Sequence, residues 1–254
     1  MISEISDTAN WVAWYRALES ARPDPLFVDP WAGVLAGDRG RAIAQCMRGP
    51  RDGAGMVAVR TALIDQLVTA AIARDRIDTV VNLACGFDTR PFRLELPAHL
   101  RWFDIDGPPI IARKCEVLGR AAPRCRWHPL VADLAAGKAR REALRTAMDG
   151  AQRALVLTEG LLPYLHADQV SALATDLAFN PACTVWITDL LSADSQPRVA
   201  QIYRKPFAAS GIRSASVQRT ARLFSPRSGS QKSRRRSIGG TARRTSPTSC
   251  TMTR

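Results

Sequence analysis

The segment Thr79-Val-Val-Asn-Leu-Ala-Cys-Gly-Phe-Asp-Thr-Arg90 carries the strongest structural signal in this chain. Its apolar, β-branched start predicts a buried strand, and its small residues Ala84-Cys-Gly86 predict a tight turn that a ligand can approach. An acidic pair follows in Trp102-Phe-Asp-Ile-Asp106, and Asp106 lies about 20 positions after Gly86. A strand, a tight turn and an acid after the next strand are the parts of a nucleotide-binding β-α-β unit. The turn has one glycine where the usual fingerprint has three, so an ordinary buried strand and turn is the alternative.

Strands and helices are expected to alternate on both sides of this segment. Apolar runs predict strands, and stretches of helical spacing between them predict helices. The expected strands are 79–84, 101–105, 126–131, 154–158 and 183–190, and the expected helices are 56–74, 108–120, 138–148 and 167–179. The fold class is therefore predicted to be α/β, a Rossmann-like parallel sheet with helices on both faces and an N-terminal helical extension.

The positive charge of the chain is concentrated at its end. The formal net charge is +13, yet residues 1–203 contain 23 basic and 23 acidic side chains, which cancel. Residues 204–254 contain 13 basic residues and no acid, and most of 210–254 is predicted to be disordered. Together with the expected strands and helices, this charge distribution divides the chain into three regions. They are a helical segment over 1–75 that is expected to cap the ligand site, a Rossmann-like core over 76–203 and a basic tail over 204–254.

The six cysteines do not form a metal-binding or disulfide pattern. They are Cys46, Cys85, Cys115, Cys125, Cys183 and Cys250. None lies in a Cys-x-x-Cys pair and no histidine stands at ligand spacing, so no metal is predicted and free thiols in a reducing cytoplasm are expected. No secretion signal and no apolar stretch long enough to span a membrane is expected, so we predict a cytoplasmic protein without a membrane partner.

Several further segments, in chain order, resemble one protein family. They are Ser20–Ala32, Val59–Asp65, Val81–Arg90, Phe103–Lys114, Val131–Leu134 and Thr158–Leu165. Together they are similar to the leucine carboxyl methyltransferase-like family of S-adenosylmethionine-dependent methyltransferases, which is abundant in actinobacteria. The resemblance covers roughly residues 3–200 and implies a class I methyltransferase fold with S-adenosyl-L-methionine as cofactor.

The resemblance assigns cofactor contacts to individual residues. Gly86 would let the backbone approach the cofactor, and Asp106 would accept hydrogen bonds from both ribose hydroxyls. Arg60 would pair with the cofactor carboxylate, and Glu159 would face its methionine end. For Asp106 the alternative is a solvated strand end, for Arg60 a surface helix charge, and for Glu159 a structural strand end.

Two neighbouring residues would hold the adenine. Asp133 would place a carboxylate near the adenine amino group, and Leu134 would form an apolar wall beside the ring. The alternative for Asp133 is a helix N-cap. Arg16 would either line the cofactor pocket or be an ordinary surface arginine.

The region after the fifth strand departs from the family. The family continues there with an antiparallel hairpin of two strands that closes the sheet, whereas this chain has its Arg, Ser and Thr tail. The hairpin is expected to be missing, which would leave the strand around Thr184–Leu190 with an unpaired edge. The composition of the tail favours the hypothesis of an out-of-frame translation of GC-rich DNA.

The expected activity is methyl transfer to oxygen, on a carboxylate or hydroxyl of a small molecule or peptide. A carboxylate acceptor needs no general base because it is ionised at neutral pH. No catalytic residue is assigned, since His128 and His166 are isolated and more often structural. Three alternatives stay open: a truncated inactive methyltransferase remnant, an NAD-dependent oxidoreductase, and a nonspecific nucleic-acid binder acting through the tail. The methyl acceptor and the oligomeric state are left open.

Overall fold

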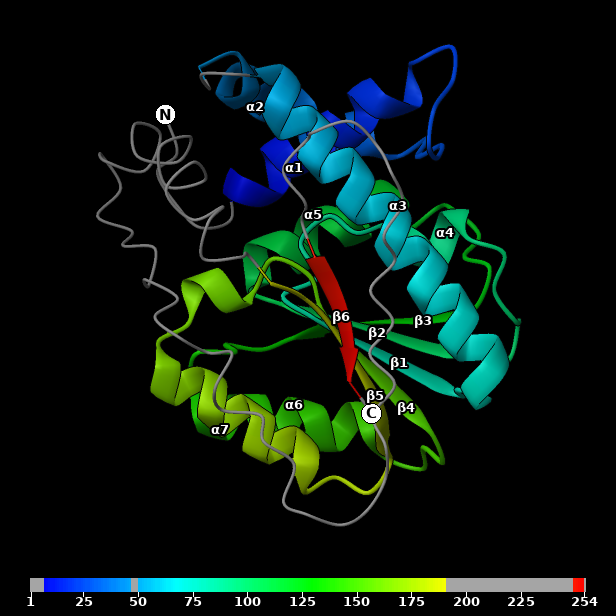
Figure 1. Cartoon of the computed structure of the whole chain (residues 1–254), viewed down its shortest axis with the longest axis vertical. Coiled ribbons are helices and arrows are strands. Elements are labelled where there is room, and N and C mark those ends of the chain that lie inside the picture. The colour runs from blue at the N-terminus through cyan, green and yellow to red at the C-terminus, as the bar shows by residue number, and fades with distance from the viewer. Residues whose placement is uncertain (1–6, 47–49, 191–248, 254) are drawn as a thin grey trace.

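A computed structural model describes residues 7–46, 50–190 and 249–253. Its strands are β1 (Thr79–Leu83), β2 (Arg101–Asp106), β3 (Arg126–Val131), β4 (Ala154–Thr158), β5 (Cys183–Leu190) and β6 (Ser249–Thr253). Its helices are α1 (Asp7–Ser20), α2 (Ala32–Cys46), α3 (Pro50–Asp75), α4 (Arg90–Arg93), α5 (Pro108–Leu118), α6 (Gly137–Met148) and α7 (Ala167–Ala178), with a short 3-10 helix η1 (Leu162–Tyr164) (Figure 1).

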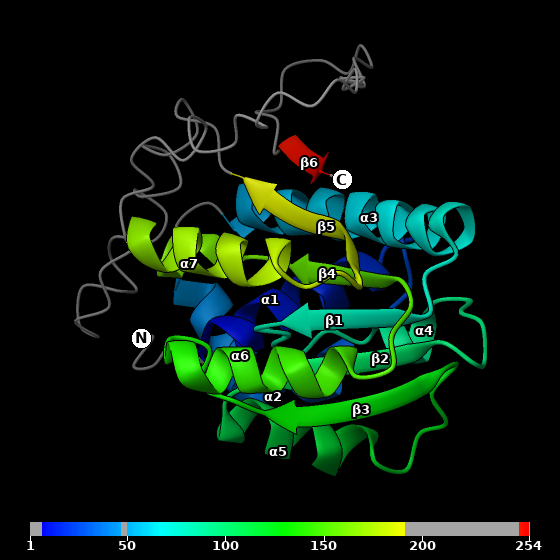
Figure 2. The same cartoon turned by 90° about the horizontal axis from the view of Figure 1, so that it is seen from below.

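The sheet has the strand order β3-β2-β1-β4-β5-β6, and β1 to β5 run parallel. Helices cover both of its faces, with α6 and α7 on one side and α3 on the other (Figure 2). The predicted α/β fold class is thus confirmed. The order reverses between β1 and β4, and in such sheets ligands bind outside the carboxyl ends of the strands at this reversal.

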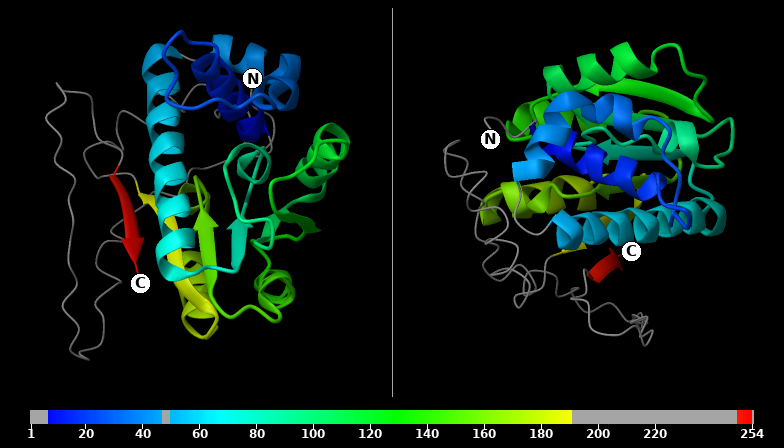
Figure 3. Two further views of the ribbon diagram at one scale, coloured as in Figure 1. Left: turned by 90° about the vertical axis from the view of Figure 1, so that its right-hand side faces the viewer. Right: turned by 90° about the horizontal axis from the view of Figure 1, so that it is seen from above.

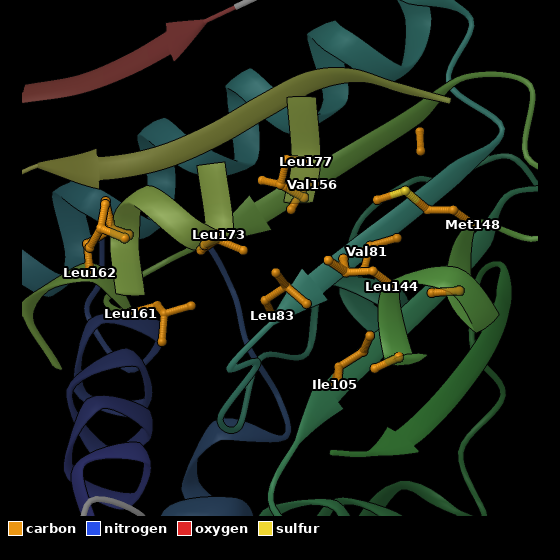
Figure 4. Packing of buried hydrophobic residues seen from close by; sticks show 14 residues of the cluster. Val81, Leu83, Ile105, Leu144, Met148, Val156, Leu161, Leu162, Leu173 and Leu177 are labelled. Atoms are coloured by element: carbon orange, nitrogen blue, oxygen red, sulfur yellow. The ribbon is translucent and has the colours of Figure 1, made fainter. Parts of the chain in front are cut away.

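Alternate residues of each strand enter two different cores. Val81 and Leu83 pack with α6 and α7 on one face (Figure 4), whereas Val80 packs against Ile64 and Val68 of α3 on the other. Every residue of β1 is buried, as is every residue of β4. This burial on both faces explains why the sequence of these strands is mostly apolar instead of alternating, with Asn82 as the polar residue inside β1.

Helix α3 corrects the expectation that no apolar stretch of the chain is long enough to span a membrane. Its segment Gly53–Asp75 is long and apolar enough, by length and composition, to cross a membrane. In the fold, however, Ile64, Val68 and Ala71 are buried in the core beside the sheet. Its Asp65 is also buried and paired with arginines. Helix α3 is therefore a packed element of the α/β domain.

Helices α1 and α2 lie over the carboxyl ends of the strands (Figures 1 and 3). The two helices approach closely at Gly40, where an added Cβ would come within 2.4 Å of the backbone oxygen of Asn10. Arg16 of α1 reaches down to the loop after β1, where it donates to the backbone oxygen of Phe87 at 2.5 Å. The N-terminal segment thereby contacts the edge at which a ligand is expected.

The expectation of an unpaired edge on β5 is wrong. Strand β6 pairs antiparallel with β5, and the register runs from Trp186 opposite Thr253 to Leu190 opposite Ser249. The strand comes from the very end of the basic tail, which was expected to be disordered. Residues 191–248, which hold most of the tail and the region of the expected missing hairpin, lie outside the described part of the chain.

Candidate functional site

The loop after β1 has a backbone conformation suited to small residues. Gly86 has a φ of 49° and Ala84 a φ of 52°, both in the left-handed region. An added Cβ at Gly86 would also lie 3.4 Å from the Cβ of Ala9 in α1. Glycine at 86 therefore meets two requirements, and Ala84 adopts a conformation that costs an L-residue roughly 1–2 kcal/mol.

Asp106 is held against this loop by backbone groups. Its Oδ2 accepts a hydrogen bond from the Gly86 N–H at 2.8 Å, and its Oδ1 accepts one from the Gly107 N–H at 2.7 Å. Burial raises the pKa of Asp106, and these two hydrogen bonds oppose that rise. Each carboxylate oxygen still has acceptor capacity, which is what a pair of ribose hydroxyls requires.

Asp133 and Leu134 lie beside Asp106, in the loop between β3 and α6. The Ala132 N–H donates to the backbone oxygen of Asp106 at 3.0 Å, which joins the two strand ends. The Asp133 side chain is exposed and accepts a hydrogen bond from the Ala135 N–H at 2.9 Å. Helix α6 begins at Gly137 with Ala136 as its N-cap, so Asp133 is not the helix cap that was the alternative for it, and the adenine contact stays a prediction.

A buried arginine fixes the position of this loop. The Nη1 of Arg140 donates to the backbone oxygen of Leu134 at 3.2 Å, and its Nη2 pairs with Asp176 of α7 at 2.8 Å. Leu134 itself packs partly buried against the core formed with α6 and α7. The predicted adenine wall is thus anchored to both helices of that face.

Arg60 and Glu159, predicted from distant parts of the sequence, meet at the other side of the site. The Nε of Arg60 lies 2.9 Å from Oε1 of Glu159, and its Nη1 lies 3.2 Å from Oδ2 of Asp189. Asp189 is the next-to-last residue of β5 and accepts the Gly160 N–H at 2.6 Å. A cofactor carboxylate at Arg60 would therefore share the guanidinium with two protein carboxylates.

Arg90 connects the remaining acids. Its Nε lies 2.7 Å from Asp65, and its Nη1 lies 2.6 Å from Asp88 and 2.8 Å from Oε2 of Glu159. Its side chain is only 2% exposed, so these charges are largely shielded from water. Burial would raise the pKa of Glu159, but the positive charges of Arg90 and Arg60 lower it below its ordinary value.

A second charged cluster is centred on Asp104 of β2, and we call it the β2 cluster. Asp104 pairs with Lys114 at 2.7 Å, and both side chains are fully buried. The carboxylate also accepts the indole N–H groups of Trp102 at 3.0 Å and Trp127 at 2.7 Å. The Nζ of Lys114 lies 3.6 Å from the Sγ of Cys85, so this cluster underlies the loop after β1.

Arg16 is a buried bracing residue. Its Nε pairs with Asp29 at 2.9 Å, and Asp29 in turn accepts the hydroxyl of Thr89 at 2.7 Å. With the contact to the Phe87 backbone, these bonds tie α1 to the loop after β1. Arg16 is therefore not an ordinary surface arginine.

The sequence analysis missed Asp65, Asp88, Arg90 and Asp189 as parts of this site. A signal was present for three of them. Asp189 is the next-to-last residue of an apolar strand and Glu159 follows one directly, while Asp88 with Arg90 forms the charged end of the loop after β1. A charged residue directly after a buried strand needs a partner, which the sequence alone does not name.

The two isolated histidines have local contacts. The ring of His128 stacks on Phe103 at 4.8 Å between centroids, and burial together with Arg101 and Arg126 lowers its pKa. His166 precedes α7, where its N–H donates to the side chain of Gln169 at 2.8 Å. Within residues 7–46, 50–190 and 249–253, no group of three or more His, Cys, Asp or Glu could hold a metal ion.

The sequence matches a known family. Residues 9–178 match the family described as leucine carboxyl methyltransferase. A protein of Parafrankia sp. (strain EAN1pec), named as an S-adenosyl-L-methionine-dependent methyltransferase, is 39% identical over 186 residues, which cover 68% of this chain and 58% of that protein. A protein of the same name from Mycobacteroides abscessus is 36% identical over 194 residues, with coverages of 69% and 61%. The chain thus spans about three fifths of the length of these relatives.

Two solved structures have a similar fold. A DUF574 family protein from Streptomyces avermitilis MA-4680 aligns with a TM-score of 0.61 over 84% of this chain and 79% of its own, at 15% identity. A protein from Thermobifida fusca YX, described as a methyltransferase, aligns with a TM-score of 0.54 over 81% and 74%, also at 15% identity. At this identity the likeness concerns the fold alone.

Proposed function

Because this chain belongs to the leucine carboxyl methyltransferase family, we propose that it is an S-adenosyl-L-methionine-dependent methyltransferase. One observation carries the proposal. Gly86, Asp106 and Glu159, predicted for the two ends of the cofactor, lie at the carboxyl ends of β1, β2 and β4, next to the reversal of strand order. Arg60 of α3 pairs with Glu159 at the same edge. The names of the relatives support the same cofactor.

The donor groups fit the cofactor chemically. Asp106 has acceptor capacity for the ribose hydroxyls, while Gly86 keeps side-chain atoms away from the loop that would face the cofactor. The amino-acid end of the cofactor carries a carboxylate and an ammonium. The cation of Arg60 and the anion of Glu159 offer one partner for each. Asp133 and Leu134 complete the set at the adenine.

S-Adenosyl-L-methionine would supply an electrophilic methyl group on its sulfonium. The protein residues would bind and orient it, since methyl transfer depends on an in-line approach of the two reactants. Asp106 and Gly86 would fix the nucleoside, and Arg60 with Glu159 would fix the amino-acid end. Helices α1 and α2 would limit the access of water from above the strand ends.

We further propose that the acceptor atom is oxygen, on a carboxylate or hydroxyl of a small molecule or peptide. The family name points to a carboxylate, which requires no proton removal at neutral pH. No nucleic acid or membrane is proposed as a partner, and the five free cysteines among the described residues fit a reducing cytoplasm.

Titration calorimetry with S-adenosyl-L-methionine and S-adenosylhomocysteine tests the cofactor. We expect binding by the unmodified chain and a loss of about tenfold or more for Asp106→Ala, because each hydrogen bond to a charged group contributes about 1.5–3 kcal/mol. Asp78→Ala, a variant of an acid at the opposite end of β1, is the matched control and should bind normally. Unchanged affinity in folded Asp106→Ala would remove the ribose role.

The same titration separates the alternatives. An oxidoreductase would bind NAD in place of S-adenosylhomocysteine, since an acid after the second strand also suits that cofactor. A remnant would bind neither ligand, or would bind S-adenosylhomocysteine without transferring methyl groups to any carboxylate or hydroxyl acceptor. Tritium transfer from labelled S-adenosyl-L-methionine to a panel of such acceptors measures the second property.

A further inference from the structure

One neutral side chain joins the two charged clusters of the site. Asn82 lies on β1 and is only 2% exposed. Its Nδ2 donates to Oδ1 of Asp104 at 3.1 Å and to Oδ2 of Asp88 at 2.9 Å. An amide nitrogen carries two N–H groups, so one side chain can serve two carboxylates that have no hydrogens of their own to donate.

From Asp104 the contacts lead to the ribose end. Asp104 pairs with Lys114, whose Nζ lies 3.6 Å from Sγ of Cys85 in the loop after β1. Asp106 stands two residues further along the same strand and accepts the N–H of Gly86 in that loop. The Asp104 side of Asn82 is therefore continuous with the group predicted to hold the ribose.

From Asp88 the contacts lead to the methionine end. The Oδ2 that accepts from Asn82 also pairs with Nη1 of Arg90 at 2.6 Å. The same Nη1 lies 2.8 Å from Glu159, which pairs with Arg60 at 2.9 Å. A displacement of Asn82 would thus be transmitted to the pair predicted to hold the amino-acid end.

Asn82 is an unusual choice for its position. It stands in Val80-Val-Asn-Leu83, a strand buried on both faces, and asparagine is depleted in strands. A buried amide without partners would destabilise the fold, whereas this one bridges two elements of the site. The low strand propensity of asparagine is explained if its two hydrogen bonds contribute to the function of the site.

We propose that Asn82 is a positioning residue that couples the ribose end of the cofactor site to its methionine end. The inference rests on the proposed function and extends it. The loop from Gly86 to Arg90 contacts both ends, and binding at one end is transmitted through this loop and Asn82 to the other. The two halves of the cofactor then contribute cooperatively to binding, and removal of the amide makes them independent.

A mutant cycle measured in two backgrounds tests this coupling. Asp106→Asn weakens the ribose end, Glu159→Gln weakens the methionine end, and both are combined. Calorimetric Kd values for S-adenosylhomocysteine then give a coupling factor, which we expect to be about fivefold or more. In the Asn82→Ser background, where one hydroxyl cannot donate to two carboxylates, the factor should fall to near one.

Two further variants separate positioning from mere stability. Val80→Ala removes buried volume from the same strand without touching a polar group, so it should lower the melting temperature and leave the coupling factor unchanged. Asn82→Gln keeps both N–H donors and should retain part of the coupling. If Asn82→Ser does not fold, Asn82→Thr takes its place, because a β-branched residue suits the strand and still offers a single donor.

The outcomes are distinct. A coupling factor near one in the unmodified chain, or an equal factor in the Asn82→Ser background, overturns the role of Asn82 while the proposed function stands. A parallel loss of coupling in Val80→Ala would show that it follows stability alone, and it would overturn the proposal equally. Failure of the unmodified chain to bind S-adenosylhomocysteine removes the proposed function, and the inference with it.

Discussion

The two charged clusters that Asn82 joins have central groups of opposite charge. Under β2 a single carboxylate, Asp104, is surrounded by donors from Asn82, Trp102, Lys114 and Trp127. At the carboxyl ends of β1 and β4 the central group is a buried cation, Arg90, which contacts three carboxylates. They are Asp88, Asp65, which also pairs with Arg93, and Glu159, which also pairs with Arg60. Both central groups are buried, so each depends on its neighbours for the interactions that water would otherwise provide.

This difference has a consequence for pH. When the central group of the β2 cluster is removed, a buried cation remains, and it can become neutral only by losing a proton. When the central group of the other cluster is removed, carboxylates remain, and they become neutral by gaining protons. The two clusters should therefore respond to mutation with opposite pH dependence.

Arg90→Gln should have the largest effect. It leaves Asp88 without its ion-pair partner and removes one of two arginines from Asp65 and from Glu159. Removing one partner of a buried ion pair costs about 3–5 kcal/mol. Burial raises the pKa of Asp88, and Arg90 opposes that rise, so in the variant the folded-state pKa of Asp88 would lie above its unfolded value and stability should be regained as the pH falls through it. Urea unfolding at several pH values measures this.

The control for Arg90→Gln is Arg145→Gln, because Arg145 pairs with Glu142 on the exposed face of α6. Exposed pairs contribute little, so the control should be close to neutral at every pH. A loss in Arg90→Gln that grows on acidification would contradict the arrangement of charges described above.

Asp104→Asn should have the second largest effect, a loss of about 3 kcal/mol in the free energy of unfolding. The amide oxygen still accepts from an indole N–H, but Lys114 loses its counter-ion in a fully buried position. Its folded-state pKa, now raised by Asp104, would fall below the unfolded value. The variant should then recover stability as the pH rises, which is the reverse of Arg90→Gln.

The paired comparison is decisive because one instrument and one denaturant serve both variants. If stability depends on pH in the same way in both variants, then lost packing, and not the unpaired charge, determines the loss of stability in both clusters. Asp104→Leu provides a further check: it also leaves Lys114 alone, but it removes the acceptor for the indoles and should be less stable than Asp104→Asn.

The sequence predicted the strands well because their signal is local. The strand β4 begins and ends where expected, at 154 and 158, and β5 does so at 183 and 190. Apolar runs that are buried on both faces stand out against the polar helix surfaces between them. Helix α4 was missed, since its four residues are too few to show a period.

The partners of the site residues could not be predicted in the same way. Arg60 and Asp189 are 129 positions apart, and nothing in either neighbourhood marks the other. No role was expected for Asp189, and the expectations for Arg60 and Glu159 came from family resemblance, which concerns a bound cofactor. It therefore gave no account of how Arg60 and Glu159 hold each other, or of Asn82 between the clusters.

Glu159→Gln should cost less than either central substitution, about 2 kcal/mol, because its side chain is partly exposed. The lowered pKa of Glu159 means that its ion pairs contribute fully above pH 4.5, its ordinary value, and are lost as the pH falls through the folded-state value. The unmodified chain should thus lose stability more steeply than the variant on acidification. Parallel acid profiles would show that Glu159 is not the titrating group.

Substitutions in the loop after β1, at Gly86 and Ala84, should change the free energy of unfolding least, and the two variants test the same backbone conformation in opposite directions. Gly86→Ala places a methyl group at a φ of 49° and near the Cβ of Ala9, so it should lose roughly 1–2 kcal/mol. Ala84→Gly relieves the same backbone conformation at a φ of 52°, but it removes a methyl group that packs on the core and adds freedom to the unfolded chain. These contributions oppose each other, and the change should stay within about 0.5 kcal/mol. Thermal unfolding of the two variants tests the loop directly, because a large gain in Ala84→Gly would mean that the strain at this position is not balanced by packing.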